Sequence, residues 1–228
     1  MAGEHIINYM KWVCHWRGLG NHMDPDEELP VTKGKLDLVM ATAILTASRG
    51  TLLGYVLSTD IGRQQVELVI SDRPCGAQDV AQQLGIETII IEDDDNRDLS
   101  DKVLKLLEVR MIDQLITVFS RLLEGNLLNV YRNRIYNLHP SLLPAFPGLN
   151  SFERASESGA RFIGETIHIV DKEIDSGPIL LQASIACPYK HEKAIRHRLF
   201  VAECKMLIQL LAWLAERRVV LEGTSIKV

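Results

Sequence analysis

From about residue 38 onward, hydrophobic and polar residues follow two patterns along the chain. Short, nearly continuous apolar runs indicate strands of a buried sheet, and we expect them at residues 38–46, 66–71, 87–91, 112–119, 134–139, 165–170 and 179–185. Apolar residues at helical spacing indicate helices, at residues 52–58, 75–84, 100–110, 151–158 and 192–217. The alternation predicts an α/β fold, a mostly parallel sheet with helices on both faces.

The first 36 residues show neither pattern. They contain Trp12 and Trp16 and an acidic stretch bounded by prolines at residues 24–30. We therefore expect residues 1–36 to be an N-terminal extension, with one short helix, and residues 37–228 to form the domain. The spacing of cysteine and histidine in this extension matches no standard zinc pattern, so we expect packing through the tryptophans rather than a metal site.

Composition and charge narrow the class of protein. Hydrophobic residues make up 46% and charged residues 24% of the chain, which is typical of a soluble globular protein. The net charge of −5 argues against a nucleic-acid partner. No apolar stretch approaches the roughly 20 residues of a membrane span, and the start does not resemble a signal peptide. The 4 cysteines form no CxxC pair, so we expect reduced thiols in a cytoplasmic protein.

Polar side chains gather where such a sheet binds ligands, beyond the carboxyl ends of its strands. Asn137 and His139 are two residues apart at the end of a predicted strand, so their side chains point the same way. His168 and Asp175 flank the loop after another strand, and a tight turn at 175–178 could project Asp175 inward. Each residue also has an ordinary structural explanation, so the pattern alone indicates only a site around His139. The acidic run at 93–95 is interpreted as a solvated loop.

Two segments resemble the signature of folate-dependent formyltransferases. The first is Asn-Leu-His-Pro-Ser-Leu-Leu-Pro at 137–144, followed by Phe-Pro-Gly at 146–148, and the second spans 164–168 and 174–182. The resemblance extends over about residues 38–222 and is greatest to the phosphoribosylglycinamide formyltransferases of purine biosynthesis. It implies a Rossmann-like fold and transfer of a formyl group from 10-formyltetrahydrofolate to the amine of glycinamide ribonucleotide, without a metal.

The resemblance also implies roles for individual residues. Asn137 and His139 would stabilise the negative oxygen of a tetrahedral intermediate, Asp175 would relay protons through water, and His168 would support them. Folate would lie against Phe119, Ser120, Arg121, Leu122, Asp171 and Ile174. The nucleotide would be held by Ser48, Arg49, Gly50 and Thr51 at its phosphate and by Glu203 at its ribose hydroxyls.

The chain departs from the family pattern in the phosphate-binding turn. Ser48 stands where the family has a glycine, and Leu52 stands where it has an asparagine. These changes leave the acceptor open. Another amine, such as an amino sugar, is one alternative, and a diverged folate-binding regulatory protein is another. A formyl-folate hydrolase is less favoured, because such enzymes carry an added N-terminal domain. We expect a monomer or a homodimer.

Overall fold

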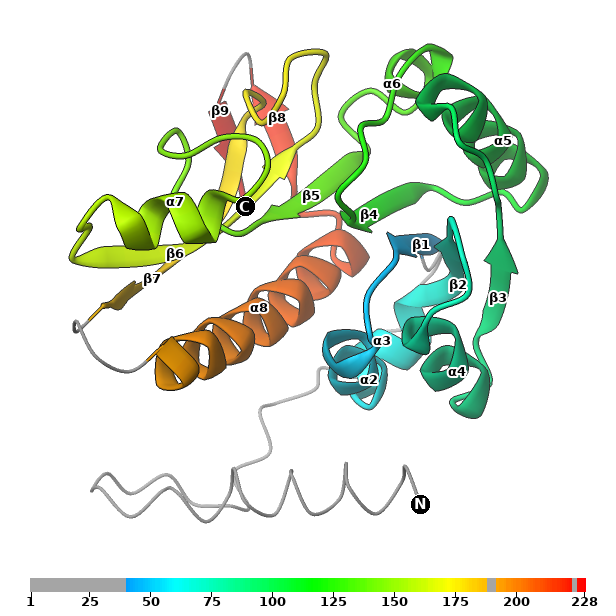
Figure 1. Ribbon diagram of the computed structural model, residues 1–228. Helices are drawn as coiled ribbons and strands as arrows, with labels where there is room; N and C mark the ends of the chain where they lie inside the picture. Colours follow the sequence, from blue (N-terminus) through cyan, green and yellow to red (C-terminus); the bar gives the residue numbers. More distant parts are fainter. Residues whose placement is uncertain (1–39, 188–191, 223–224) are drawn as a thin grey trace. The chain divides into compact units, whose positions relative to one another are not determined.

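A central sheet of seven strands organises the computed structural model, which describes residues 40–187, 192–222 and 225–228 (Figure 1). The strand order is β3-β2-β1-β4-β5-β6-β7. The pairs from β3 to β5 are parallel, whereas β5–β6 and β6–β7 are antiparallel. The strands are β1 (Thr42–Thr46), β2 (Val66–Ser71), β3 (Glu87–Ile90), β4 (Gln114–Val118), β5 (Ile135–His139), β6 (Phe162–Ile169) and β7 (Ile179–Ala186).

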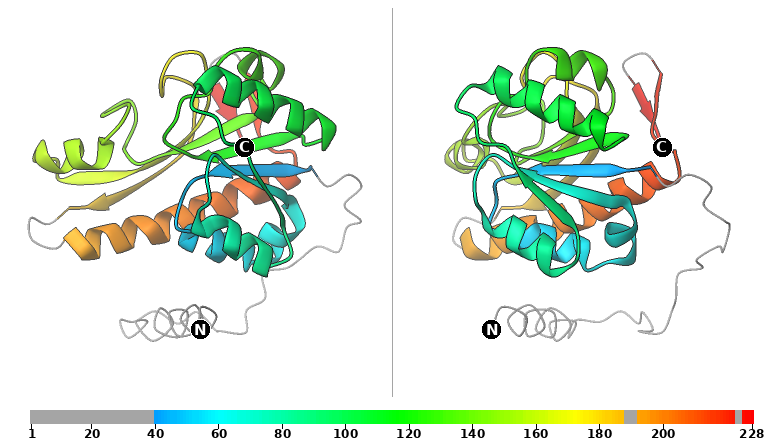
Figure 2. Two further views of the ribbon diagram at one scale, coloured as in Figure 1. Left: turned by 45° about the vertical axis from the view of Figure 1, so that its right-hand side comes forward. Right: turned by 90° about the vertical axis from the view of Figure 1, so that its right-hand side faces the viewer.

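Helices cover both faces of this sheet, as Figure 2 shows. One face carries α2 (Thr51–Leu57), α3 (Asp60–Gln65), α4 (Gly76–Gln83) and α8 (Glu192–Ala215), and the other carries α5 (Asn96–Val109) and α6 (Asn126–Val130). The short α7 (Ser151–Glu157) contacts β6, and β8 (Val220–Glu222) pairs with β9 (Ser225–Lys227). The predicted α/β fold, with a mostly parallel sheet and helices on both faces, is confirmed.

The hydrophobic core has two large clusters, one on each face of the sheet, and a smaller third cluster formed by α7, β6, β7 and the first part of α8. Alternate residues of one strand serve opposite clusters, so Ile44 and Ile116 pack toward α2 and α8, whereas Leu45 and Leu115 pack toward α5. All four side chains are at most 2% exposed. Burial on both faces explains why the strands have nearly continuous apolar sequences.

Several elements differ from the sequence prediction. The first strand begins at Thr42 rather than 38, and α3 and α6, with 6 and 5 residues, were not predicted because they are too short to show periodicity. Helix α5 begins four residues earlier than predicted, at Asn96. Its start is set by Asp95, whose side chain accepts hydrogen bonds from the N–H groups of Arg97 and Asp98. The β8–β9 hairpin was also missed, and the predicted extension over residues 1–36 lies outside the described residues.

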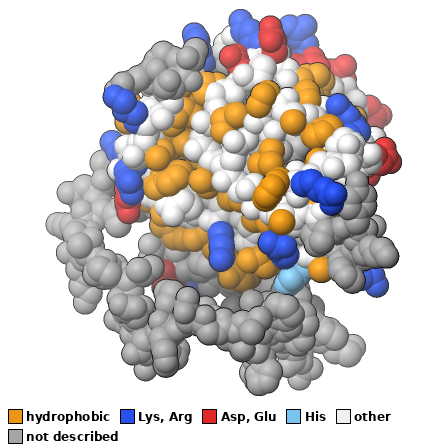
Figure 3. Space-filling view, turned by 90° about the vertical axis from the view of Figure 1, so that its left-hand side faces the viewer, with side chains coloured by type: hydrophobic (Ala, Val, Ile, Leu, Met, Phe, Trp, Pro, Cys, Tyr) orange, Lys and Arg blue, Asp and Glu red, His pale blue; other side chains and the backbone are white. Residues whose placement is uncertain are grey.

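The β7 edge of the sheet carries exposed apolar side chains. Figure 3 views the side where β6, β7 and α7 lie, and hydrophobic side chains gather there among lysines and arginines. Phe162 on β6 is 62% exposed and Ile179 on β7 is 41% exposed. Within the described residues, no helix is both long enough and apolar enough to cross a membrane.

Close contact between β6 and β7 depends on a glycine, which gives a first prediction. A Cβ at Gly164 would collide with the carbonyl oxygen of Ala183 on β7 and with the Leu142 side chain. Gly164→Ala should therefore lower the free energy of unfolding by roughly 3 kcal/mol or more, measured by urea denaturation.

The matched control is Gly85→Ala, because no atom lies within 4 Å of a Cβ placed there. Its cost should be limited to the strain of a φ of +78°, about 1–2 kcal/mol. Equal losses for the two variants would show that the β6–β7 contact is not what Gly164 serves.

Candidate functional site

The core of the site is a row of polar residues across three neighbouring strands. Thr117 on β4 pairs with Asn137 on β5, which in turn pairs with His168 on β6. Directly paired residues project on the same face of a sheet, so their side chains are brought together. The Thr117 hydroxyl donates to Asn137 Oδ1 at 2.8 Å, and Asn137 Nδ2 lies 3.2 Å from His168 Nε2. This row lies on the face that α5 and α6 cover further along.

Two further residues complete the cluster. His139 follows Asn137 by two positions and therefore projects on the same face. Asp175, from the loop after β6, lies between the histidines: its Oδ2 is 3.3 Å from His139 Nδ1 and its Oδ1 is 3.4 Å from His168 Nε2. The side chains of His139, His168 and Asp175 are only 6%, 2% and 12% exposed. The structure thus brings together all four residues of the predicted centre.

The carboxylate of Asp175 is held in its charged form. Burial would raise its pKa, but hydrogen bonds with His168 and with the Gly148 N–H, together with the charges of the two histidines, outweigh burial. The pKa of Asp175 is therefore lowered from its ordinary value. The Gly148 N–H donates to Oδ2 at 2.7 Å. Asp175 is thus an ionised acceptor at neutral pH.

The loop that carries Asp175 is closed tightly at its base. The Ile169 N–H donates to the Pro178 carbonyl at 2.9 Å, and a Cβ at Gly177 would collide with the Ile169 carbonyl oxygen. Only glycine allows this approach. Asp175 itself has a φ of 50°, a left-handed conformation that aspartate tolerates better than most residues. This backbone directs the carboxylate inward, as the sequence predicted from the turn.

A second loop, residues 140–150, supports His139 from the other side. His139 Nε2 lies 3.1 Å from the Phe146 carbonyl oxygen, so both ring nitrogens of His139 face oxygen acceptors. The loop is tied to β6 through Thr166, which accepts from the Leu143 N–H and donates to the Ser141 carbonyl. Sequence reasoning missed Thr117 and Thr166, because threonines within apolar strands give no distinguishing signal.

The predicted phosphate-binding turn leads directly into α2. Gly50 is the residue before the helix, with a φ of 89°, and a Cβ there would collide with the backbone of Gly76. The Ser48 hydroxyl lies 3.1 Å from Thr46 Oγ1 and accepts from the Gly50 N–H, so it is used within the turn. Arg49 and Thr51 are exposed. The turn therefore presents these two side chains to solvent.

The predicted folate residues fall into two groups in the structure. Arg121 is engaged with the protein, because its guanidinium donates to Asn96 Oδ1 and to the carbonyl oxygens of Asp93 and Asp94 and lies 3.4 Å from Asp72 Oδ2. It thereby ties together the loops after β2 and β3. The remaining predicted residues lie on loops, with Phe119 partly buried and Ser120, Leu122, Asp171 and Ile174 exposed.

Glu203 is separate from the four-residue cluster. It lies on α8, on the opposite face of the sheet from Asn137, and its carboxyl group is hydrogen-bonded to Glu165 of β6. Glu165 was not predicted as a site residue. Its sequence signal is a carboxylate between the apolar residues Ile163 and Ile167 of β6.

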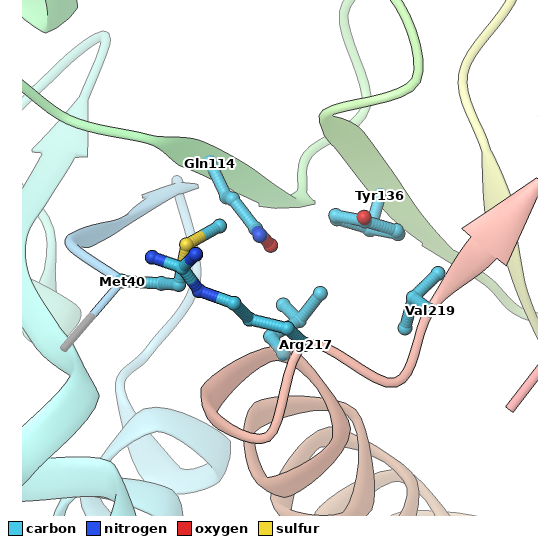
Figure 4. Close-up of a pocket in the computed structure, with 6 residues that line it drawn as sticks. Met40, Gln114, Tyr136, Arg217 and Val219 are labelled. Carbon is cyan, nitrogen blue, oxygen red and sulfur yellow. The ribbon is translucent and has the colours of Figure 1, made fainter. Parts of the chain in front are cut away.

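A cavity of about 260 Å³ lies elsewhere, at the amino ends of β4 and β5 (Figure 4). It is lined by Met40, Gln114, Tyr136, Leu214, Arg217 and Val219. Gln114 Oε1 is buried there, without a hydrogen-bond partner in the part of the chain that the structure describes. None of these residues belongs to the predicted site.

The chain belongs to the formyl transferase family, whose model matches residues 46–211. A phosphoribosylglycinamide formyltransferase of Mycobacterium tuberculosis (strain CDC 1551 / Oshkosh) is 30% identical over 189 residues, 80% of this chain and 88% of that protein. A crystal structure of glycinamide ribonucleotide transformylase 1 from Symbiobacterium toebii superposes with a TM-score of 0.77 at 29% identity, covering 83% of this chain and 94% of that one. The resemblance inferred from the sequence is confirmed at the level of the family.

A formyltetrahydrofolate deformylase from Pseudomonas syringae pv. tomato has the same fold, with a TM-score of 0.72. Its identity is 23%, and the match covers 82% of this chain and 65% of that chain. At this identity the likeness concerns the fold alone.

The lowered pKa of Asp175 gives a prediction for stability. A carboxylate with a lowered pKa stabilises the fold above the ordinary carboxyl pKa of about 3.9, and this contribution is lost as the pH falls. Asp175→Asn should therefore lower the free energy of unfolding at pH 7, by roughly 1.5–3 kcal/mol for a charge-assisted hydrogen bond. The difference from wild type should shrink toward pH 3.

Urea denaturation at pH 7, 5 and 3 measures this difference. Asp101→Asn, at an exposed position of α5, is the control for removing one carboxylate. A loss for Asp175→Asn that stays constant over this pH range would contradict the assignment of a charged, hydrogen-bonded Asp175.

Proposed function

We propose that this protein transfers the formyl group of 10-formyltetrahydrofolate to the amine of glycinamide ribonucleotide, a step of purine biosynthesis in the cytoplasm. The observation that carries the proposal is the convergence of Asn137, His139, His168 and Asp175 at the carboxyl end of the sheet. The two relatives with phosphoribosylglycinamide or glycinamide ribonucleotide transfer in their names support the acceptor. Reduced folate and nucleotide are the partners, and no metal is required.

The reaction develops a negative oxygen on the former formyl carbonyl. Asn137 and His139 are the donors that would stabilise this oxygen, each worth about 3–4 kcal/mol in the transition state. Thr117 fixes the orientation of the Asn137 amide, because its hydroxyl donates to Oδ1 and leaves Nδ2 as the donor. His139 would exchange its hydrogen bond with the Phe146 carbonyl for one with the formyl oxygen.

Asp175 would stabilise the positive charge that develops on the attacking amine. The attacking amine becomes cationic when the tetrahedral intermediate forms, and an ionised carboxylate nearby favours that cation. Through water, Asp175 would accept the amine proton and return it to the departing folate nitrogen, a contribution of about 10²–10⁴-fold. Its hydrogen bonds with His168 and Gly148 keep it ionised and correctly placed.

The decisive experiment incubates the purified full-length chain with 10-formyltetrahydrofolate, with and without glycinamide ribonucleotide. We expect deformylated folate, detected by its absorbance, to appear only when both substrates are present. Formate release without an amine would instead indicate a hydrolase. Transfer only to an amino sugar would indicate a different acceptor, and binding of folate with no turnover would indicate a binding protein.

Asp175→Asn tests the proton relay within the same assay. The amide keeps an oxygen that can accept from Gly148 but cannot take up a proton, so kcat should fall by at least about 10²-fold. Asp101→Asn on α5 should leave kcat unchanged. Near-normal turnover of Asp175→Asn would remove Asp175 from this role.

Thr117→Val tests the orientation of Asn137. Valine has nearly the same shape but cannot donate to Asn137 Oδ1, and a lost hydrogen bond of about 1 kcal/mol corresponds to a roughly 5-fold lower kcat. Thr88→Val on β3 is the matched control, because Thr88 bonds only Gln82 at an exposed edge among the described contacts. Equal kinetics for the two variants would contradict the positioning role of Thr117.

A further inference from the structure

Two acidic side chains meet in the apolar interior between β6 and α8. Glu165 is 1% exposed, whereas Glu203 is partly exposed. Their carboxyl groups are hydrogen-bonded to each other. Two ionised carboxylates in contact would repel each other and would both be costly to bury. A pair of this kind persists only when one member carries a proton.

The pair lies between two hydrophobic clusters: the large cluster that α2 and α8 share, and the small cluster formed by α7, β6, β7 and the first part of α8. Neighbours two residues apart on a strand and four apart on a helix lie on the same side as the carboxylates. On one side of the pair, the neighbours on β6 and α8 belong to the small cluster, and on the other side they belong to the large cluster. These flanking residues are Ile163 and Ile167 on β6 and Leu199 and Leu207 on α8. Apolar packing on both sides therefore directs the two carboxyl groups toward each other.

Burial favours Glu165 as the member that carries the proton, because Glu165 is 1% exposed whereas Glu203 is partly exposed. Burial, followed by the charge and hydrogen bond of Glu203, raises the pKa of Glu165. Burial also raises the pKa of Glu203, and the hydrogen bond from Glu165 works in the opposite direction. Glu165 Oε2 is buried with no hydrogen-bond partner among the described residues. A neutral acid tolerates such an oxygen at far less cost than an anion does.

Glu203 lies on α8, which packs against α2, the helix that follows the predicted phosphate-binding turn. Helix α2 begins directly after this turn, and its Leu53 shares a hydrophobic cluster with Met206 and Leu207 of α8. A nucleotide whose phosphate binds at Thr51 would therefore lie near α8. The more exposed carboxyl group of the pair belongs to that helix.

We propose that Glu165 is a positioning residue for the acceptor: it donates a hydrogen bond to one oxygen of Glu203 and so aims the other oxygen at neighbouring hydroxyls of the bound nucleotide. This inference rests on the proposed function, in which Glu203 accepts from the ribose hydroxyls of glycinamide ribonucleotide. A vicinal diol is the chemical group that the held carboxylate recognises. Glu165 acts only through Glu203 and does not touch the reacting atoms.

Kinetics of two Glu165 variants in the full chain test this role. Glu165→Leu removes the donor and should raise the KM for glycinamide ribonucleotide roughly 10-fold, the equivalent of one or two hydrogen bonds, with kcat within about 2-fold. Glu165→Gln keeps an N–H donor and should restore the KM. A merely structural role would move kcat and KM without this rescue.

Direct binding separates this inference from the proposed function. The Kd of glycinamide ribonucleotide is measured by calorimetry for the wild type and for both variants. A wild type that binds no nucleotide would overturn the proposed function, and with it the role of Glu203 as its ligand. Wild-type binding that Glu165→Leu leaves unchanged would overturn the positioning role alone.

The shared proton has a readout that needs no ligand. The titratable group that faces Glu165 from α8 is Glu203, and Cys204 is the next residue on that helix. The partner of Glu165 on β7 is Ala183, which does not titrate. On β5, His139 pairs with Thr166 and therefore projects on the other face of the sheet. A buried acid whose pKa is raised in the folded protein lowers the protein's stability as the pH rises above the acid's unfolded pKa of about 4.3, because the group then ionises in the unfolded chain but stays neutral in the folded one.

Glu165→Gln cannot ionise, so its melting temperature should gain on the wild type by several degrees between about pH 5 and pH 8. This comparison uses the conservative variant, which remains informative if Glu165→Leu folds poorly. A difference that does not change over this pH range would show that Glu165 holds no extra proton and would overturn the proposal.

Discussion

The register between β5 and β6 is the constraint on which the site depends. Because Asn137 pairs with His168, the amide, the histidine and the next alternate residue, His139, all project on one face. A slip of one residue would turn these side chains to the opposite face, into the cluster beneath α8. The same slip would separate Thr166 from the loop that supports His139. The polar centre is therefore as firmly specified as the apolar core around it.

Neighbours decide the protonation of buried carboxyl groups in this protein. Asp175 lies between two histidines and accepts a backbone N–H, so its pKa is lowered despite burial. Glu165 meets another carboxyl group, so burial and like charge both raise its pKa. One fold thus holds one acid charged and another neutral at the same pH. In the proposed function these two states serve proton relay and acceptor placement.

The structure shows which contacts the residues that depart from the family pattern, or lie in its binding segments, make. Ser48, where the family has a glycine, uses its hydroxyl inside the turn, and Gly50 retains the left-handed backbone that the start of α2 needs. Arg121 occupies the predicted folate segment, yet its guanidinium ties the loops after β2 and β3. Its contribution to a folate pocket would therefore come from holding these loops rather than from a free charge.

The sequence by itself determined the elements that local pattern can encode. Apolar runs and helical spacing predicted the seven strands of the main sheet and the longer helices, and the period of two placed Asn137 and His139 on one face. Signature segments pointed to the family. Short elements such as α3 and α6 were missed because 5 or 6 residues do not establish a period.

Only the tertiary structure decided which distant residues meet. Strand order and register set Thr117 beside Asn137 and His168 opposite it, and helix packing brings Glu203 to Glu165. These contacts join residues 20 to 40 positions apart, as in the bond between Thr117 and Asn137, 20 positions apart. Local propensity carries no information about such pairs, since it reports the conformation of a segment and not its neighbours. Packing of both sheet faces supplies that information, because only one register buries every strand.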